Sequence, residues 1–393
     1  MFKSWNQVEK NKLGLMGSIL INNVLYMFIN TFLVAYFFKL SNYNYKIISI
    51  FYVFSFIFIP LTFFILSKRI DKRKVQVFRT GILLHTLFIL LLALLKENII
   101  KYFIPLGMLY GIVQGMFWCS GHILVNIYAG NDSKNFVSLK SMISKTLKII
   151  FPFIFGTSIE YTSFSSVAFI VLILAFIQFL FSILIKDIPH GNHTFSLRKY
   201  MQYLKTLRSN DLKTCYQITA LDGVVNYLLE TVVTIIIVMT FKTNISLGFL
   251  TTVFAICSIA ALFIFQRKIK DNTQILKLSS ILVISSIFLL LIDINKVTVI
   301  IYNLVNSIFL VLLINSAEAK RYSIASSYER VKKEFMIEHQ TLCEYAINFV
   351  RIIAYIILFI TSLTNNIALF KILLVGIASC IYLYASFIIK INK

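Results

Sequence analysis

Long apolar stretches recur along the whole of this chain, and they limit its fold more than any other feature. An α-helix rises 1.5 Å per residue, so about 20 residues cross the ~30 Å hydrocarbon core of a bilayer. Backbone polar groups find no water in that core, and each crossing segment must therefore be helical. The sequence predicts twelve such helices, at residues 13–38, 45–66, 77–95, 102–129, 137–159, 165–186, 215–240, 246–266, 275–294, 297–315, 341–363 and 367–389.

The composition agrees with lipid as the solvent for these helices. Hydrophobic residues make up 59% of the chain and charged residues only 14%, whereas soluble domains average about 45–50% and about 25%. The net charge of +22 resides in short basic clusters between the apolar stretches. Because no single basic face with interleaved aromatic residues is present, we do not expect nucleic-acid binding.

No motif of enzymatic or cofactor chemistry occurs in the sequence. It contains no P-loop, catalytic triad, metal-ligand spacing or dinucleotide fingerprint, so we expect neither an enzyme nor a bound cofactor or metal. The cysteines lie within or beside apolar stretches, and none forms a C-x-x-C pair, which argues against a zinc site or a disulfide framework. They are Cys119, Cys215, Cys257, Cys343 and Cys380.

The basic residues predict the orientation in the membrane, since cytoplasmic loops carry an excess of Lys and Arg. If the N-terminus is placed inside, most basic residues fall in the connections on the same side. We therefore expect a multi-pass protein of the cell membrane with both termini in the cytoplasm. The inside connections are residues 1–12, 67–76, 130–136, 186–214, 267–277, 316–340 and 390–393.

Features of the first half of the chain recur about 200 residues later. The basic segment 68–72 corresponds to 267–271, and polar positions on the first span correspond to polar positions on the seventh. Two halves repeated in the same orientation are typical of one large transporter architecture. We therefore predict a six-helix bundle over 1–186, a cytoplasmic linker over 187–214 and a second six-helix bundle over 215–393.

Two carboxylates on the seventh span are the most specific local signal. Asp222, Asn226 and Glu230 are spaced i, i+4 and i+8, which places them along one side of a continuous helix. Charges at bilayer depth are costly and normally face a cavity or a partner. One interpretation makes Asp222 and Glu230 proton-coupling groups, so that Asp222→Asn abolishes proton-linked transport without affecting folding. The alternative is a pair of structural hydrogen-bonding or ion-paired residues.

Polar side chains on three other spans are candidates for lining a substrate cavity. Those on the fourth span recur at steps of four residues and combine aromatic with hydrogen-bonding groups, which suits an amphipathic or ring-bearing cargo. The alternative is hydrogen bonding between helices, at about 0.6 kcal/mol per bond. The candidates are Asn22, Tyr26 and Asn30 on the first span, Gln114, Trp118 and His122 on the fourth, and Asn303 and Asn306 on the tenth, together with Asn226 on the seventh.

Charged residues on the fifth and eleventh spans allow two interpretations. Lys148 lies about 16 Å along the helix from residue 137, too deep to reach the headgroups easily. Glu344, Asn348 and Arg351 share one face of the eleventh span. Lys148 and Arg351 either form salt bridges between spans or attract an anionic cargo. The mixed-charge segment 329–334 predicts a short solvated helix with i, i+4 pairs.

Two sequence patterns resemble the major facilitator superfamily. Its signature after the second span reads roughly G-x-x-x-D-[RK]-x-G-[RK]-[RK]; Asp71 and Lys72 match it, whereas Ser67 takes the first glycine position. The fifth-span signature of many exporters, around G-P-x-x-G-G, is similar at Pro152 and Gly156.

Two further segments are similar to poorly characterised bacterial members of that superfamily. One is the run Gly111-Ile112-Val113-Gln114-Gly115-Met116-Phe117-Trp118, and the other is the Glu/Arg pattern that enters the eleventh span. The resemblance implies two halves that rock about a midplane site lined mainly by spans one, four, seven and ten. It also implies a cytoplasmic gate, for which Asp71, Lys72 and Arg73 are the candidates.

The sequence as a whole favours a secondary active transporter that works by alternating access. We expect proton-coupled efflux of a small amphipathic compound or peptide. Nutrient uptake by the same fold remains an alternative, as does a non-transporting membrane sensor or immunity protein. The expected partners are the small-molecule or peptide substrate, protons and the lipid bilayer. The sequence leaves the cargo, the coupling ion and the oligomeric state open.

Overall fold

The computed structural model describes residues 7–68, 70–129, 133–187, 195–207, 209–269, 273–364 and 367–390. Within these ranges every regular element is a helix, and twelve helical segments are long and apolar enough to cross a membrane. The predicted all-α fold with twelve spans is therefore confirmed. The spans cover Glu9–Leu40, Lys46–Ser67, Arg73–Lys101, Phe103–Val125, Met142–Tyr161, Phe164–Ile183, Asn210–Phe241, Asn244–Phe265, Thr273–Ile292, Lys296–Ser327, Met336–Leu363 and Ala368–Lys390.

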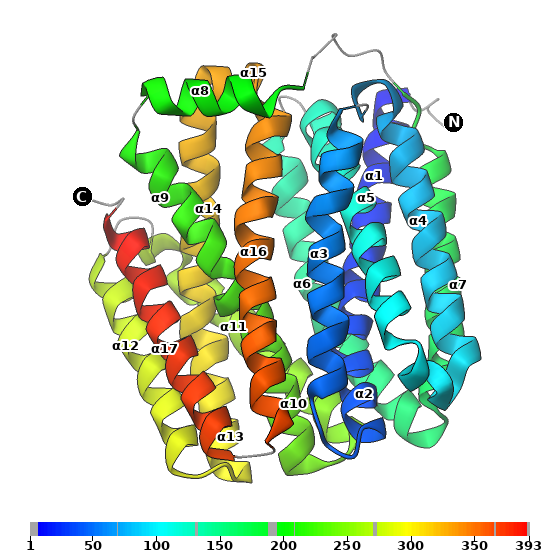
Figure 1. Cartoon of the computed structure of the whole chain (residues 1–393), viewed down its shortest axis with the longest axis vertical. Helices are drawn as coiled ribbons and strands as arrows, with labels where there is room; N and C mark the ends of the chain where they lie inside the picture. Colours follow the sequence, from blue (N-terminus) through cyan, green and yellow to red (C-terminus); the bar gives the residue numbers. More distant parts are fainter. Residues whose placement is uncertain are drawn as a thin grey trace.

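The first six spans form one side of the molecule (Figure 1). The first span is a composite of two α-helices joined by a π-helical segment, in which the backbone is wound more loosely than in an α-helix. The elements are α1 (Gln7–Met27), η1 (Phe28–Leu33), α2 (Val34–Leu40), α3 (Lys46–Ser67), α4 (Ile70–Leu95), η2 (Lys96–Lys101), α5 (Phe103–Ala129), α6 (Ser133–Tyr161) and α7 (Phe164–Ile183).

The last six spans form the other side, and two of them also contain π-helical segments. The elements are α9 (Asn210–Asp222), η4 (Gly223–Leu228), α10 (Leu229–Phe241), α11 (Asn244–Ile269), α12 (Thr273–Ile292), α13 (Lys296–Val305), η5 (Asn306–Leu310), α14 (Val311–Ser327), α16 (Met336–Leu363) and α17 (Ile367–Lys390). The short α15 (Glu329–Lys333) confirms the predicted helix, and Arg330 pairs there with Glu334 at 3.2 Å.

Several helix limits differ from the sequence prediction. The tenth span was expected to end at residue 315, but α14 continues to Ser327. The seventh span begins at Asn210, five residues earlier than expected. Polar residues near a span end lower the local hydropathy, although the helix continues there because neighbouring helices satisfy the side chains. Residues 210–214 and 316–327, which hydropathy assigns to loops, therefore belong to the helices of the bundle.

A further helix, α8 (Leu197–Leu207), lies within the predicted linker and crosses one end of the bundle (Figure 1). We call this the linker end, and the other the opposite end. Tyr200 fixes α8 to the seventh and eleventh spans, because its hydroxyl lies 2.8 Å from that of Tyr216 and 3.0 Å from Nδ1 of His339. Burial raises the pKa of Tyr200, so its hydroxyl stays protonated and available for these bonds.

Several helix pairs join the two halves. α3 packs on α16, α6 packs on α11, and α2 packs on α10. At the second pair the backbones approach so closely that a Cβ atom added to Gly156 would lie 2.5 Å from the carbonyl oxygen of Asn244. A Cβ atom added to Gly248 would likewise clash with the carbonyl oxygen of Pro152. The exporter-like Pro152 and Gly156 therefore serve contact between the halves.

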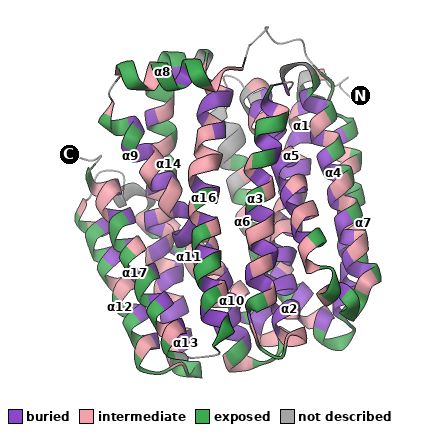
Figure 2. Cartoon of the chain, viewed as in Figure 1, coloured by how far each residue is buried: buried purple, intermediate pink, exposed green. Residues whose placement is uncertain are grey.

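The pattern of buried and exposed residues is the one expected for a protein whose solvent is lipid. Residues that face neighbouring helices are buried, whereas exposed residues run along the outer faces of α7, α12 and α17 (Figure 2). Large apolar side chains such as Phe263, Ile292 and Ile173 are more than 60% exposed. An apolar outer surface of this extent would be insoluble in water but is stable against acyl chains. The packing thus agrees with a multi-pass membrane protein.

Candidate functional site

The seventh span contains a π-helical segment between its two carboxylates. Gly223–Leu228 separates Asp222, at the end of α9, from Glu230, in the first turn of α10. A π-helix has more residues per turn than an α-helix, so the spacing expected for a continuous α-helix does not apply across it. Asp222, Asn226 and Glu230 therefore do not form the single stripe that the spacing predicts, and the two carboxylates lie in separate environments.

Asp222 lies in the interior of the second half. Its carboxylate is 4% exposed and accepts a hydrogen bond of 3.0 Å from the Tyr384 hydroxyl. Arg321 pairs with its other oxygen at 3.4 Å. Arg321 had been assigned to a loop, and only the extension of α14 brings it into the bundle. Asp222 thus joins the seventh, tenth and twelfth spans by polar contacts within one half.

Glu230 faces the other half of the molecule. It keeps part of its surface exposed, as do Asn226 and Tyr227 on the same span. Lys148 on α6 is near enough to act electrostatically on the Glu230 carboxylate. The lysine is itself exposed, although it lies midway along its helix. An exposed lysine and a partly exposed glutamate therefore lie within electrostatic range of each other across the interface between the halves.

Tyrosines from five spans lie within electrostatic range of the Glu230 carboxylate. The first, second, fourth, seventh and eleventh spans therefore converge there. The tyrosines are Tyr26, Tyr52, Tyr110, Tyr227 and Tyr355. Tyr26 and Tyr110 belong to polar patterns that the sequence shows, whereas Tyr52, Tyr227 and Tyr355 do not, because a tyrosine within an apolar span is equally suited to packing.

Arg351 completes the polar centre from the eleventh span. Its guanidinium carbon lies 3.4 Å from the ring centroid of Tyr227 and 5.0 Å from that of Phe56 on the other half. Its Nη1 donates a 3.0 Å hydrogen bond to Asn348, whereas its Nε has no partner among the described residues. Asn348 in turn donates to Glu344 at 3.1 Å. On the predicted face of the eleventh span, Glu344, Asn348 and Arg351 are thus linked by hydrogen bonds, and the Arg351 guanidinium stacks on the Tyr227 ring.

Further aromatic contacts cross between the halves near the same level. The ring centroids of Tyr26 and Tyr227 are 6.4 Å apart, and those of Tyr52 and Tyr355 are 5.0 Å apart. The Tyr52 hydroxyl donates to Asn30 at 2.8 Å. Asn30 and Tyr26 therefore lie close to the polar centre, and Asn30 lies within the π-helical segment η1.

The candidates on the fourth span form a connected group. Nε1 of Trp118 donates to Gln114 at 3.1 Å, and the Trp118 ring stacks on His122 at 5.3 Å. His122 also lines a pocket shared by α3, α5 and α16, to which Gln340 contributes from the other half. The fourth-span stripe therefore meets the second half, towards the linker end.

The remaining asparagine candidates are buried. Asn22 has no hydrogen-bond partner for either side-chain atom among the described residues, whereas Asn306 lies within hydrogen-bonding reach of Tyr302. Asn303 instead donates to the carbonyl oxygen of Val299 at 2.8 Å, within its own helix. Unpaired buried amides are costly, so Asn22 marks a place where water or a ligand would be stabilising.

Charges of opposite sign line the two halves towards the linker end. Lys140 and Lys145 on α6 act electrostatically on Glu318 of α14, just as Lys148 acts on Glu230. The first half thus presents lysines to carboxylates of the second half.

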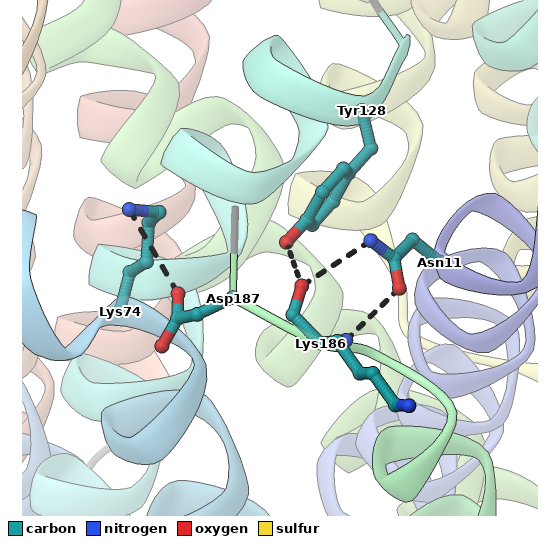
Figure 3. A network of polar contacts seen from close by, with 5 residues as sticks. All are labelled: Asn11, Lys74, Tyr128, Lys186 and Asp187. Atoms are coloured by element: carbon teal, nitrogen blue, oxygen red, sulfur yellow. Dashed lines mark hydrogen bonds and ion pairs between the residues drawn. The ribbon is translucent and has the colours of Figure 1, made fainter. Parts of the chain in front are cut away.

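The predicted gate residues are placed only in part. The side chains of Asp71 and Lys72 lie outside the described residues, and the Arg73 side chain is exposed at a kink in α4. The next residue, Lys74, is buried and pairs with Asp187 at 3.8 Å. Figure 3 shows this ion pair beside a second group of contacts, in which the Lys186 carbonyl accepts hydrogen bonds from Tyr128 and Asn11. All these contacts stay within the first half.

Comparisons with known proteins identify the fold. The sequence model of the Major Facilitator Superfamily matches residues 3–327, whereas a search of functionally curated proteins finds no match. The crystal structure of the nucleoside transporter NupG superposes with a TM-score of 0.68 at 11% identity, covering 99% of this chain and 100% of that one.

Two further solved structures agree. A bacterial homologue of the iron transporter ferroportin, in an inward-facing state, gives a TM-score of 0.65 at 13% identity over 98% of both chains. A bacterial homologue of the human lysosomal transporter Spinster, also inward-facing and unoccupied, gives 0.66 at 9% identity over 99% of this chain and 98% of that one. These identities support the shared fold alone. Together with the family match, they show that the chain is a multi-pass membrane protein of the Major Facilitator Superfamily.

Proposed function

We propose that this protein is a secondary active transporter that carries its cargo by alternating access between its two halves. The observation that carries the proposal is the convergence of five spans on Glu230, opposite Lys148. A carboxylate held at this depth, partly exposed and facing the other half, has little structural purpose unless a polar cargo or a proton reaches it. The family and the three structural neighbours, which are all transporters or their homologues, support the same conclusion.

Glu230 is the coupling group in this proposal. When it is ionised, the attraction between its carboxylate and Lys148 favours the approach of the halves. A proton that neutralises Glu230 removes this attraction, and the halves can then separate around the site. Asp222, which the sequence analysis paired with Glu230, is occupied by Arg321 and Tyr384, and its contacts favour a structural role.

The site chemistry favours a small amphipathic compound or peptide as the cargo. Aromatic rings of Tyr26, Tyr227 and Trp118 offer apolar walls, whereas Arg351, Lys148 and Glu230 offer charges of both signs. We propose efflux as the direction, because the mixed aromatic and polar lining suits compounds that partition into membranes. Labelled candidates, tested by counterflow in vesicles of known orientation, would distinguish efflux from uptake.

We further propose that the linker end faces the cytoplasm of a cell membrane and that the site opens towards it. The excess of basic residues on that side supports the orientation. Hydrogen bonds between the halves occur towards the opposite end: Lys39 donates to Asn244 at 2.9 Å, the Asn244 backbone donates to Glu160 at 2.7 Å, and Asn44 donates to the Ser362 carbonyl at 3.2 Å. Such bonds would hold that end closed.

The proposal is tested with purified protein in proteoliposomes and a pH gradient. We expect Glu230→Gln to reduce gradient-driven accumulation of a transported compound at least tenfold, while exchange without a gradient persists. Glu334→Gln, which changes an exposed carboxylate at the linker end, is the control. Full gradient-driven accumulation by Glu230→Gln would contradict Glu230 as the coupling group. Absence of flux for every compound in the wild-type protein would contradict transport itself.

A further inference from the structure

A second polar site lies outside the interface between the halves. A cavity of about 420 Å³ opens between α4 and α7 near the linker end. Its upper wall carries Gln76, Arg79 and Thr80 from α4 and Lys186 from the segment after α7. The cavity is open to the surroundings of the protein and lies where the third span begins and the sixth span ends. Polar residues at these span ends occupy the level of the lipid headgroups.

The charge of the cavity is positive. Arg79 and Lys186 both line it, together with one carboxylate, that of Asp187. That carboxylate is paired with the buried Lys74 at 3.8 Å, as Figure 3 shows. Asp187 is therefore already compensated, and the two remaining cations have no anionic partner in the lining of the cavity. A site with this balance favours an anion.

The backbone around Lys186 is fixed without the use of its ammonium group. The Lys186 carbonyl accepts bonds from the Tyr128 hydroxyl at 2.6 Å and from Asn11 at 3.2 Å, and the Lys186 amide donates to Asn11 at 2.9 Å. Figure 3 shows the Lys186 side chain leading away from these contacts. The side chain itself is exposed. The fold thus positions this lysine for a ligand rather than for an internal bond.

Arg79 is held in a similar way. Its Nε donates to the Ser182 carbonyl at 3.1 Å, and its Nη2 donates to the carbonyls of Ile183 and Ile185. These bonds satisfy the last carbonyls of the sixth span. Nη1 forms no hydrogen bond to the described residues and is left for an acceptor outside the protein. A guanidinium oriented by three carbonyls gives an anion a fixed donor.

The lower wall of the cavity is apolar and continues onto the outer surface of the protein. Leu83 and Phe179 line it. Further from the linker end, Leu87 on α4 and Phe176 on α7 are 44% and 55% exposed. A free inorganic anion would gain nothing from this surface, whereas the acyl chains of a lipid would pack along it. The cavity therefore has cationic side chains near the linker end and an apolar wall further from that end.

We propose that this cavity binds an anionic phospholipid. The phosphate lies between Arg79 and Lys186, Gln76 and Thr80 donate to the headgroup oxygens, and an acyl chain descends past Leu83 and Phe179. Basic pockets between spans at the headgroup level recognise anionic lipids in this way. Because α4 and α7 belong to the same half, the lipid would stabilise that half and leave the interface between the halves free to move.

The test is native mass spectrometry of the full chain after extraction from vesicles of phosphatidylcholine and phosphatidylglycerol in equal amounts. We expect wild-type protein to retain phosphatidylglycerol preferentially. One lysine near the membrane surface contributes about 1 kcal/mol, so Lys186→Ala should weaken retention about fivefold. Lys186→Arg should restore it. Lys199→Ala, which removes an exposed lysine from α8 at the same end, should have no effect.

Two results would overturn the proposal. One is equal retention of phosphatidylglycerol by Lys186→Ala and the wild-type protein. The other is complete displacement of the lipid by inorganic phosphate at millimolar concentration, which would identify a free anion site instead. Because the Lys186 side chain takes no part in the contacts that hold its backbone, the variant is expected to fold, and its thermal unfolding in detergent serves to verify this.

Discussion

Asp222 and Glu230 both carry a carboxylate and lie eight positions apart on the same span, yet their surroundings differ. Asp222 is 4% exposed and bonded to Arg321 and Tyr384 within the second half. Glu230 is partly exposed and faces Lys148 of the first half. A carboxylate within one half moves with its partners as a rigid unit. A carboxylate between the halves would change its surroundings in the alternating-access motion proposed above, so of the two only Glu230 meets the condition for the proposed proton coupling.

The largest expected effect is that of Asp222→Asn. Loss of one partner from a buried ion pair leaves Arg321 without compensation and costs about 3 kcal/mol. We therefore expect a lower unfolding temperature in detergent and reduced yield, in contrast to the folded but uncoupled protein that the sequence pattern predicts. The double variant Asp222→Asn with Arg321→Met should recover most of the stability. A stable Asp222→Asn protein without proton coupling would reverse the distinction drawn between the two carboxylates.

Exchange of the charges at Glu230 and Lys148 is expected to have the next largest effect. Lys148→Glu alone places two carboxylates opposite each other and should reduce transport at least tenfold. The double variant Glu230→Lys with Lys148→Glu restores the attraction and should recover part of the rate. Transport assays in proteoliposomes measure both. If the double variant is no better than the worse single variant, the two groups do not act on each other across the interface.

Arg351→Lys should have a smaller effect confined to cargo binding. The ammonium keeps the charge but loses the flat contact with Tyr227 and the bond to Asn348. We expect about a tenfold weaker apparent affinity with little change in unfolding temperature. The concentration dependence of flux measures the affinity. An unchanged affinity would place the cargo away from Arg351.

The smallest expected effect is that of Arg330→Ala. Its pair with Glu334 is exposed on both sides, and exposed ion pairs contribute about 0–1 kcal/mol. We expect the same unfolding temperature and the same flux as in the wild-type protein. A clear loss of transport would show that α15 takes part in the motion of the halves. The different roles proposed for Asp222 and Glu230 do not involve α15.

Much of the architecture could be predicted from the sequence, because lipid imposes a simple rule on every spanning segment. Hydropathy located all twelve spans, although it ended the tenth at residue 315 instead of Ser327. That error removed Arg321 from the bundle and left Asp222 without its partner. Hydropathy averaged over neighbouring residues does not show where a helix ends when that end depends on side-chain pairing with another span.

Prediction of the site was less complete for a similar reason. The charged and amide residues stood out against the apolar background, and Glu230, Lys148 and Arg351 were selected on that basis. Tyr52, Tyr227 and Tyr355 were not selected, because an aromatic residue in a span is equally suited to packing. The π-helical segment Gly223–Leu228 was not predicted either, and it invalidates the periodicity argument for the seventh span.

The sequence by itself determined that this chain crosses a membrane many times and which residues carry polar groups into it, since both follow from the cost of polar groups in hydrocarbon. Only the tertiary structure decided which polar groups face one another. Asp222 pairs with Arg321 from a span about a hundred residues away, and Glu230 lies within electrostatic range of Lys148 on the other half. Pairings of this kind depend on how the helices pack side by side, and no spacing along one helix contains that information.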